Sequence, residues 1–92
     1  MTHGDVLRRR ENRRLFLLRL YELSEESTEV YEDGYAIAED LGLSRQDAER
    51  IARYFEDYGY VKNTGGSALV LRITAPGIDH VEGEVIRQNS HP

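Results

Sequence analysis

The segment from Leu41 to Asp47 is the feature of this sequence that most constrains its fold. Its letters are LGLSRQD. Gly42 is typical of the position just after a helix, and Ser44 followed three residues later by an acid is typical of a helix N-terminus. Two helices are therefore expected to meet across a turn of three or four residues. Leu43, which follows the glycine, is placed to pack into a core beyond that turn.

The flanking residues predict these two helices at 35–41 and 45–58. The second one carries its apolar side chains at the spacing of one helix face, and we expect that face to be buried: Ala48, Ile51, Ala52 and Phe55. Small residues on both helices allow them to cross closely. Gly59 ends the second helix.

A longer helix is predicted at residues 5–23, with Asp5 as its N-cap. The apolar residues of its second half spread over about 220° of a helical wheel, wider than the stripe of an ordinary surface helix. Two explanations stay open. A second chain covers part of this arc, which predicts a homodimer through Phe16, Leu17 and Leu20, or the helix lies centrally within one domain. Its first half carries arginines in nearly every direction, so we expect it to project beyond the core.

The remaining elements are shorter. Residues 24–34 form an acidic connector, in which Val30 and Tyr31 are expected to make a short strand. Residues 60–74 read as a β-hairpin with a glycine-containing turn, and Leu69, Leu71 and Ile73 share one of its faces. Residues 75–87 form a last helix capped by Thr74, and the residues from 88 onward are expected to fray. The whole chain, 1–92, is expected to be one domain.

Composition excludes several classes of protein. The 92 residues include no cysteine, which rules out a disulfide scaffold and cysteine-ligated metals. No apolar run approaches the length of a membrane span or a signal peptide, so a soluble, cytoplasmic protein is expected. The sequence offers no phosphate loop, no nucleophile with a paired base and no convincing metal-binding face. We therefore predict no enzymatic activity, no cofactor and no metal.

Charge is distributed unevenly along the chain. The net charge is −5, yet residues 1–20 carry six arginines against two acids, and residues 21–44 carry eight acids and no base. A chain of this net sign is not attracted to nucleic acid as a whole. Any contact with nucleic acid must come from a local basic patch, of which the arginines near the N-terminus are the clearest.

Three stretches carry a resemblance to a known family. Residues 37–51 (IAEDLGLSRQDAERI), 55–61 (FEDYGYV) and 73–78 (ITAPGI) are similar to the signature segments of winged helix-turn-helix proteins. The order of helices and hairpin agrees with that plan. The resemblance implies an α+β, mostly helical fold with a three-helix core, a β-hairpin wing and a C-terminal helix. It also implies that 45–58 is the recognition helix and 60–74 the wing.

The resemblance yields a set of expected DNA contacts. Arg and Gln side chains can each pair with a base edge through two hydrogen bonds. The residues expected to face DNA from the recognition helix are Arg45, Gln46, Glu49, Arg50 and Arg53. Those expected to contact the DNA backbone from the wing and the first helix are Lys62, Asn63, Thr64, Arg72, Arg8, Arg9, Arg10, Arg13 and Arg14. The tyrosines at 21, 54, 58 and 60 are expected at the edges of the core, with their hydroxyl groups in water.

Two functions remain open on this basis. The first is sequence-specific binding of double-stranded DNA by a small transcriptional regulator, with residues 45–58 in the major groove. The alternative is a winged-helix module that binds another protein and no DNA. The net charge and the acids of residues 45–58, which outnumber its arginines, favour the alternative.

Overall fold

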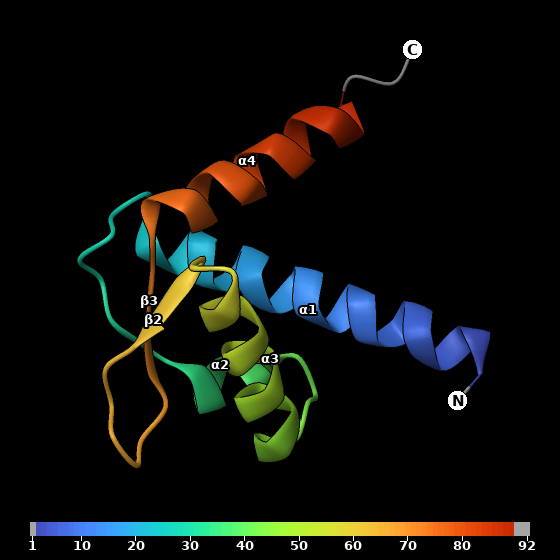
Figure 1. Ribbon diagram of the computed structural model, residues 1–92, viewed down its shortest axis with the longest axis horizontal. Helices are drawn as coiled ribbons and strands as arrows, with labels where there is room; N and C mark the ends of the chain where they lie inside the picture. The colour runs from blue at the N-terminus through green and yellow to red at the C-terminus, as the bar shows by residue number, and fades with distance from the viewer. Residues whose placement is uncertain (1, 90–92) are drawn as a thin grey trace.

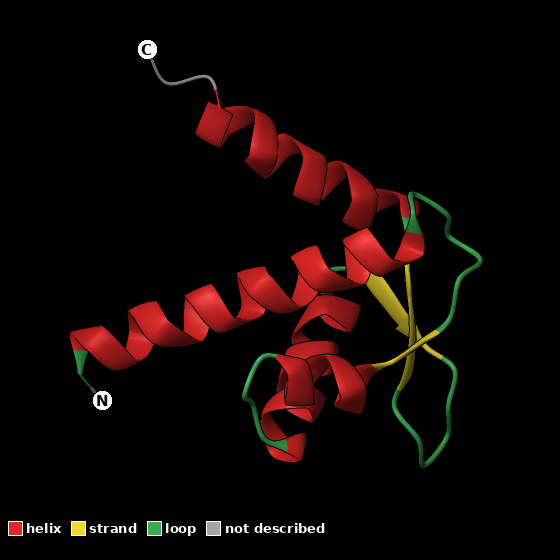
Figure 2. Ribbon diagram, turned by 180° about the vertical axis from the view of Figure 1, so that it is seen from behind, coloured by secondary structure: helices red, strands yellow, loops and turns green. Residues whose placement is uncertain are grey.

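The computed structural model describes residues 2–89, and α1 (His3–Ser24) is the longest of the four helices that these residues form. Together with three short antiparallel strands they make a mostly helical α+β arrangement (Figure 2). The other elements, in chain order, are β1 (Glu32–Asp33), α2 (Gly34–Asp40), α3 (Arg45–Asp57), β2 (Val61–Asn63), β3 (Val70–Ile73) and α4 (Ala75–Asn89) (Figure 1).

The second half of α1 lies at the centre of the fold. It packs against α2, α4, β1 and β3, and this accounts for its wide apolar arc. Phe16, Leu17 and Leu20 are 0%, 2% and 0% exposed within a single chain. The prediction that these three residues meet a second chain is therefore wrong, because other elements of the same chain already cover them. The alternative, central burial in one domain, is what the structure shows.

The first turn of α1 begins earlier than predicted. Thr2, not Asp5, is the N-cap: its Oγ1 accepts the Asp5 N–H at 3.3 Å, and the Asp5 carboxylate accepts the Thr2 N–H at 3.4 Å. These hydrogen bonds hold the pKa of Asp5 below its ordinary value. Asp5 thus takes the third helical position of a capping box, which starts the helix at residue 3.

The turn between α2 and α3 follows the sequence prediction closely. Gly42 adopts a φ of 73°, and the Leu43 N–H donates to the Ala38 carbonyl at 2.8 Å. Ser44 and Asp47 cap each other, as predicted. The helix before the turn starts one residue early, at position 34, because the Asp33 carboxylate caps it by accepting the Tyr35 N–H at 2.9 Å.

The sheet is built around β3, with β1 on one side and β2 on the other. β1 pairs Glu32 with Leu71, so this strand lies two residues beyond the predicted position at Val30 and Tyr31. The Gly34 N–H extends the pairing by donating to the Leu69 carbonyl at 2.8 Å. The connector therefore enters the sheet only where it reaches α2.

The last helix, α4, is capped by Thr74, whose Oγ1 accepts the Gly77 N–H at 3.1 Å, as predicted. It continues two residues past the predicted end, to Asn89, so the fraying predicted for residues 88 and 89 is wrong. The same prediction for residues 90–92 lies outside the described residues. α1 and α4 diverge from one end of the molecule, so that the first half of α1 and the last turns of α4 extend away from the core (Figures 1 and 2).

Tyr21 links the C-terminal end of α1 to α4. Its hydroxyl donates to Glu82 Oε2 at 2.7 Å, and Glu26 Oε1 lies 3.4 Å away. The hydrogen bond to Glu82, with desolvation by burial as the next cause, raises the pKa of Tyr21 to about 12. The ordinary value for tyrosine is about 10. Because the folded state holds the proton more tightly, this contribution to stability is fully present below about pH 10 and is lost as the pH rises through about 12.

We therefore expect alkaline pH to weaken the wild-type protein more than Tyr21→Phe. Between about pH 9 and 11, the free energy of unfolding should fall further in the wild type than in the variant, by on the order of 1 kcal/mol. Urea unfolding at both pH values measures the difference. Tyr31→Phe, which changes an exposed phenol, serves as the control and should follow the wild type. Equal losses of unfolding free energy in the wild type and in Tyr21→Phe would contradict a raised pKa of Tyr21 in the folded state.

Candidate nucleic-acid interface

The cap and the buried face of α3 decide which of its side chains reach solvent. The Ser44 Oγ accepts the Asp47 N–H at 3.0 Å, and the Asp47 carboxylate accepts the Ser44 N–H at 3.2 Å. The bond from the Ser44 N–H is the main cause that holds the pKa of Asp47 below its ordinary value, and the charges of Arg50 and Arg9 add to it. The helix buries the four predicted apolar residues, which leaves the opposite face exposed.

The exposed face of α3 forms an open groove with the hairpin loop. Gln46, Arg50 and Arg53 contribute the α3 wall, and Asn63 and Ser67 belong to the hairpin side. The three α3 side chains are exposed, as their predicted role requires. The groove also contains Glu49, Glu56 and Asp57, so its charge is mixed.

Two of the predicted DNA-facing residues already have a partner in α2. The Arg45 guanidinium carbon lies 3.8 Å from the centre of the Tyr35 ring, and the Tyr35 hydroxyl donates to Glu49 Oε2 at 3.1 Å. Burial, followed by the bond to Glu49, raises the pKa of Tyr35 above its ordinary value. These contacts hold both residues against α2. The predicted DNA-facing residues that make no such contact with Tyr35 are Gln46, Arg50 and Arg53.

The arginines of α1 divide between two sides of the helix. Arg9 and Arg13 line a hollow beside α3 together with Arg50 and Tyr54. The guanidinium carbon of Arg13 lies 4.4 Å from the centre of the Tyr54 ring. The fold thus brings the basic first half of α1 next to the predicted recognition helix, so that guanidinium groups distant in sequence share one face.

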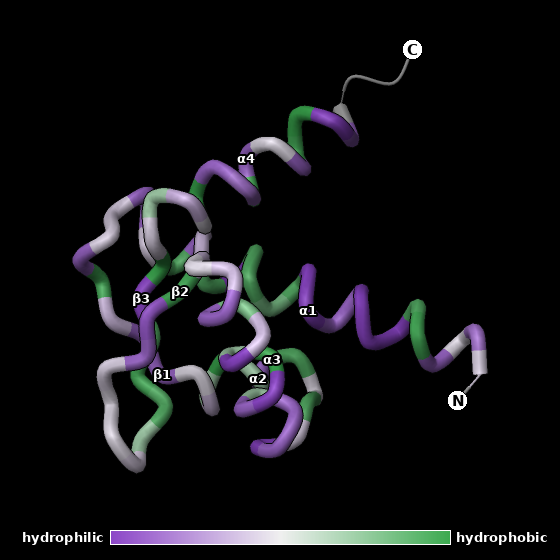
Figure 3. The backbone as a smooth tube through the Cα atoms, viewed as in Figure 1, coloured by the Kyte–Doolittle hydropathy of each residue, from purple (hydrophilic) through white to green (hydrophobic). Residues whose placement is uncertain are grey.

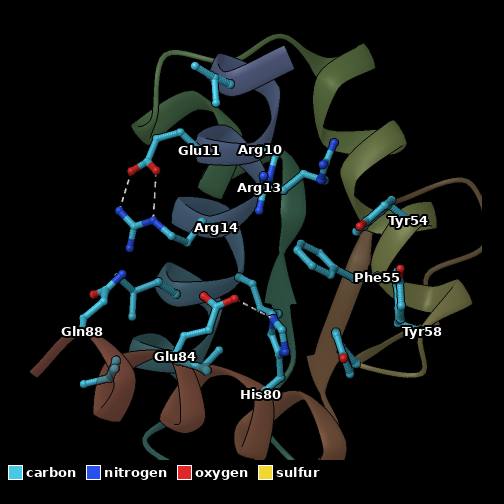
Figure 4. Close-up of a pocket in the computed structure, with 16 residues that line it drawn as sticks. Arg10, Glu11, Arg13, Arg14, Tyr54, Phe55, Tyr58, His80, Glu84 and Gln88 are labelled. Carbon is cyan, nitrogen blue, oxygen red and sulfur yellow. Dashed lines mark hydrogen bonds and ion pairs between the residues drawn. The ribbon is translucent and has the colours of Figure 1, made fainter. Parts of the chain in front are cut away.

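The other arginines of the predicted cluster lie elsewhere. Arg8 pairs with Asp5 at 2.9 Å, and Arg14 Nε donates to Glu11 Oε2 at 3.0 Å. Arg10 and Arg14 line a cleft whose other walls come from α4 and from the C-terminal half of α3 (Figure 4). The single basic cluster that the sequence predicts is therefore divided between two surfaces that share Arg13. Only the surface with Arg9 adjoins Arg50 of the predicted recognition helix.

The hairpin residues differ in their availability. Lys62 and Thr64 are exposed. The Asn63 side-chain oxygen accepts the Gly65 N–H at 3.1 Å, which stabilises the loop itself. Arg72 donates to the Thr28 carbonyl at 3.2 Å and so holds the acidic connector against the sheet. Sequence reasoning assigned Arg72 to the DNA backbone and missed this structural contact.

Sequence reasoning also missed a second feature, a cleft between α1 and α4 of about 480 Å³ (Figure 4). We call it the α1–α4 cleft. Aromatic rings line one end of it: the Tyr58 and Tyr60 rings stack at 5.3 Å between centroids, and the Tyr60 and His80 rings stack at 4.5 Å. His80 Nε2 lies 3.1 Å from Glu84 Oε1.

The exposure of the tyrosines differs from the prediction. Tyr21 and Tyr60 are half-buried at the core edge, as predicted, whereas Tyr54 and Tyr58 are 38% and 58% exposed. The four-residue spacing of Tyr54 and Tyr58 places both rings on one side of α3, and that spacing was the available signal. The spacing alone does not show that the two rings line a cleft, because the sequence does not show the position of α4.

Comparisons with family models, with curated proteins and with solved structures found no match to this chain. Within residues 2–89, no group of three or more histidine, aspartate or glutamate side chains is arranged to hold a metal ion. The helices of the same residues are also too short or too polar to cross a membrane.

Proposed function

We propose that this chain is a winged helix-turn-helix protein that binds double-stranded DNA as a small transcriptional regulator. In this proposal α3 is the recognition helix, the β2–β3 hairpin is the wing, and Gln46, Arg50 and Arg53 face the major groove. Support for the fold comes from the order of the elements and from the capped turn between α2 and α3. Recognition helices of this class read bases with residues in their N-terminal half.

The observation that carries the proposal is the position of Arg9 and Arg13. The basic half of α1 lies beside α3, where both residues share a hollow with Arg50 and Asp47, so that three arginines face one acid. A patch of this kind overcomes locally the repulsion expected from a net charge of −5. Arg9 and Arg13 would then grip phosphates beside the groove that α3 enters, and the arginines of α3 would reach the base edges.

The test is fluorescence anisotropy with mixed-sequence duplex DNA at about 50 and 200 mM salt. The two arginine–phosphate contacts of Arg9 and Arg13 predict a loss of affinity of about 10-fold between the two salt concentrations. Arg9→Ala/Arg13→Ala should weaken binding and lower the log–log salt slope by about 2. Arg19→Ala removes an arginine of α1 that pairs with Glu22 and does not line the hollow, and this control should bind like the wild type.

The alternative function keeps one specific observation in its favour. Glu49, Glu56 and Asp57 line the groove between α3 and the hairpin and repel phosphate. No binding of duplex at about 50 mM salt would contradict the DNA proposal. It would favour a winged-helix module that binds protein.

A further inference from the structure

We propose that the α1–α4 cleft is the docking surface for a second copy of this chain. The last turns of α4 from each copy enter the cleft of the other across a two-fold axis. This surface replaces the one that the sequence suggested, because the core residues of α1 are covered within one chain. The inference does not depend on DNA binding.

The first argument is the distribution of exposed apolar side chains. In the described part of the chain, seven large hydrophobic residues are exposed, and six of them lie on the helices that border the cleft: Val6, Leu7, Tyr54, Tyr58, Val85 and Ile86. Figure 3 shows the corresponding hydrophobic stretches on the projecting parts of α1 and α4. Single exposed apolar residues are normal on a protein surface, but a concentration of them marks an interaction site.

The second argument is that α4 presents apolar side chains in two directions. Val85 lines the cleft of its own chain, whereas Ile86, which is 66% exposed, does not. A second α4 lying along the cleft would place its Ile86 against Leu7 and Val85, and the two-fold axis would repeat the contact. Such a self-complementary patch is what a symmetric dimer requires.

The third argument is charge. The α1 wall of the cleft carries Arg10, Arg13 and the Arg14–Glu11 ion pair, so that it is basic overall. The α4 wall carries Glu84, which lies 3.1 Å from His80 of its own chain. Within residues 2–89, Arg10 has no ion-pair or hydrogen-bond partner. In the two-fold arrangement the basic wall of one copy faces the acidic side of α4 from the other, so that Arg10 meets Glu84 of the second copy. A surface with both signs suits its own copy better than it suits a polyanion.

The projecting helices support the same conclusion. The N-terminal part of α1 and the C-terminal part of α4 extend beyond the core (Figures 1 and 2). Most of the stability of a helix in a protein comes from tertiary packing, which these projecting turns lack within one chain. A second copy seated between α1 and α4 supplies that packing to both helices at once.

Analytical ultracentrifugation tests the proposal. At tens of micromolar or below, we expect the wild type to sediment at about twice its monomer mass of 10.6 kDa. Leu7→Asp and Ile86→Asp change exposed side chains and should raise the dimer dissociation constant at least about 10-fold, with circular dichroism unchanged. Tyr31→Asp is the matched control, because Tyr31 is 55% exposed and lies in the connector away from the cleft.

A charge exchange makes the test specific to the cleft. Arg10→Glu and Glu84→Arg should each weaken the dimer about 10-fold, and the double variant should restore it to within a few fold. A wild type that stays monomeric at several hundred micromolar would overturn the proposal. A dimer that survives both Leu7→Asp and Ile86→Asp would overturn it as well. DNA affinity, measured separately, decides the function proposed above, so that either proposal can fail alone.

Discussion

Replacing Phe16 with Ala is expected to lower the free energy of unfolding by about 3–5 kcal/mol. Phe16 is 0% exposed at the centre of the core, so the truncated side chain leaves a cavity that the packed neighbours cannot fill. A domain of this size has roughly 5–15 kcal/mol of stability in total, and the variant therefore loses a large part of it. Urea unfolding followed by circular dichroism measures the change.

The concentration dependence of this result separates two roles for Phe16. A core residue lowers stability by the same amount at any protein concentration, whereas a residue at a dimer interface shifts the apparent stability with concentration. We expect Phe16→Ala to lower the free energy of unfolding by the same amount in the monomeric Leu7→Asp background as in the wild-type background. If Phe16→Ala lowered the stability of the dimer but not that of the monomer, the central burial of α1 would be contradicted.

The Gly77→Ala variant is expected to lose about 3 kcal/mol or more in the free energy of unfolding, because the added methyl group has no room. An added Cβ would lie 2.2 Å from the carbonyl oxygen of Tyr60. That oxygen is itself held in place, since it accepts the Thr74 N–H at 3.0 Å. The first turn of α4 must therefore move away from Tyr60, and the α1–α4 cleft would change shape with it.

Gly83→Ala is the matched control within the same helix. An added Cβ at position 83 meets nothing within 4 Å, and alanine is the better helix former. This variant is expected to gain about 0.5–1 kcal/mol. Both variants restrict the unfolded chain equally, so the difference between them reports the clash at residue 77. A Gly77→Ala variant as stable as the wild type would show that α4 does not approach Tyr60 so closely.

Much of the secondary structure was predictable because its signals are local. The Ser44–Asp47 capping box, the left-handed Gly42 and the Thr74 cap each involve groups no more than three residues apart. Caps of this kind satisfy backbone groups that the helix leaves unpaired, whatever surrounds them. The buried face of α3 follows from helical spacing in the same way.

The errors have a common physical origin. The sequence shows that one half of α1 is apolar over a wide arc, but it does not show what covers that arc. A helix covered by four elements of its own chain has the same apolar pattern as a helix covered in part by a second chain, and only the positions of those elements distinguish the two cases. The shift of β1 from 30–31 to Glu32–Asp33 is similar, because pairing with β3 decides the register of a strand this short.

The candidate site was predictable in its residue types and not in its arrangement. The exposed Gln46, Arg50 and Arg53 follow from the periodicity of α3. The contacts of Arg45 and Glu49 with Tyr35 join two helices and leave no mark in the spacing of either. The separation of the α1 arginines into two surfaces likewise depends on where α3 and α4 lie.

By itself, the sequence determined where the helices and the hairpin begin and end to within about two residues, and which face of α3 is buried. Those features depend on side chain–backbone hydrogen bonds and on the repeat of the helix, which act over a few residues. Only the tertiary structure decided that α1 is central, that Gly77 must lack a side chain, and that a cleft with opposite charges on its walls separates α1 from α4. Those features depend on the packing of elements distant in the chain, and packing is set by shape and volume in three dimensions.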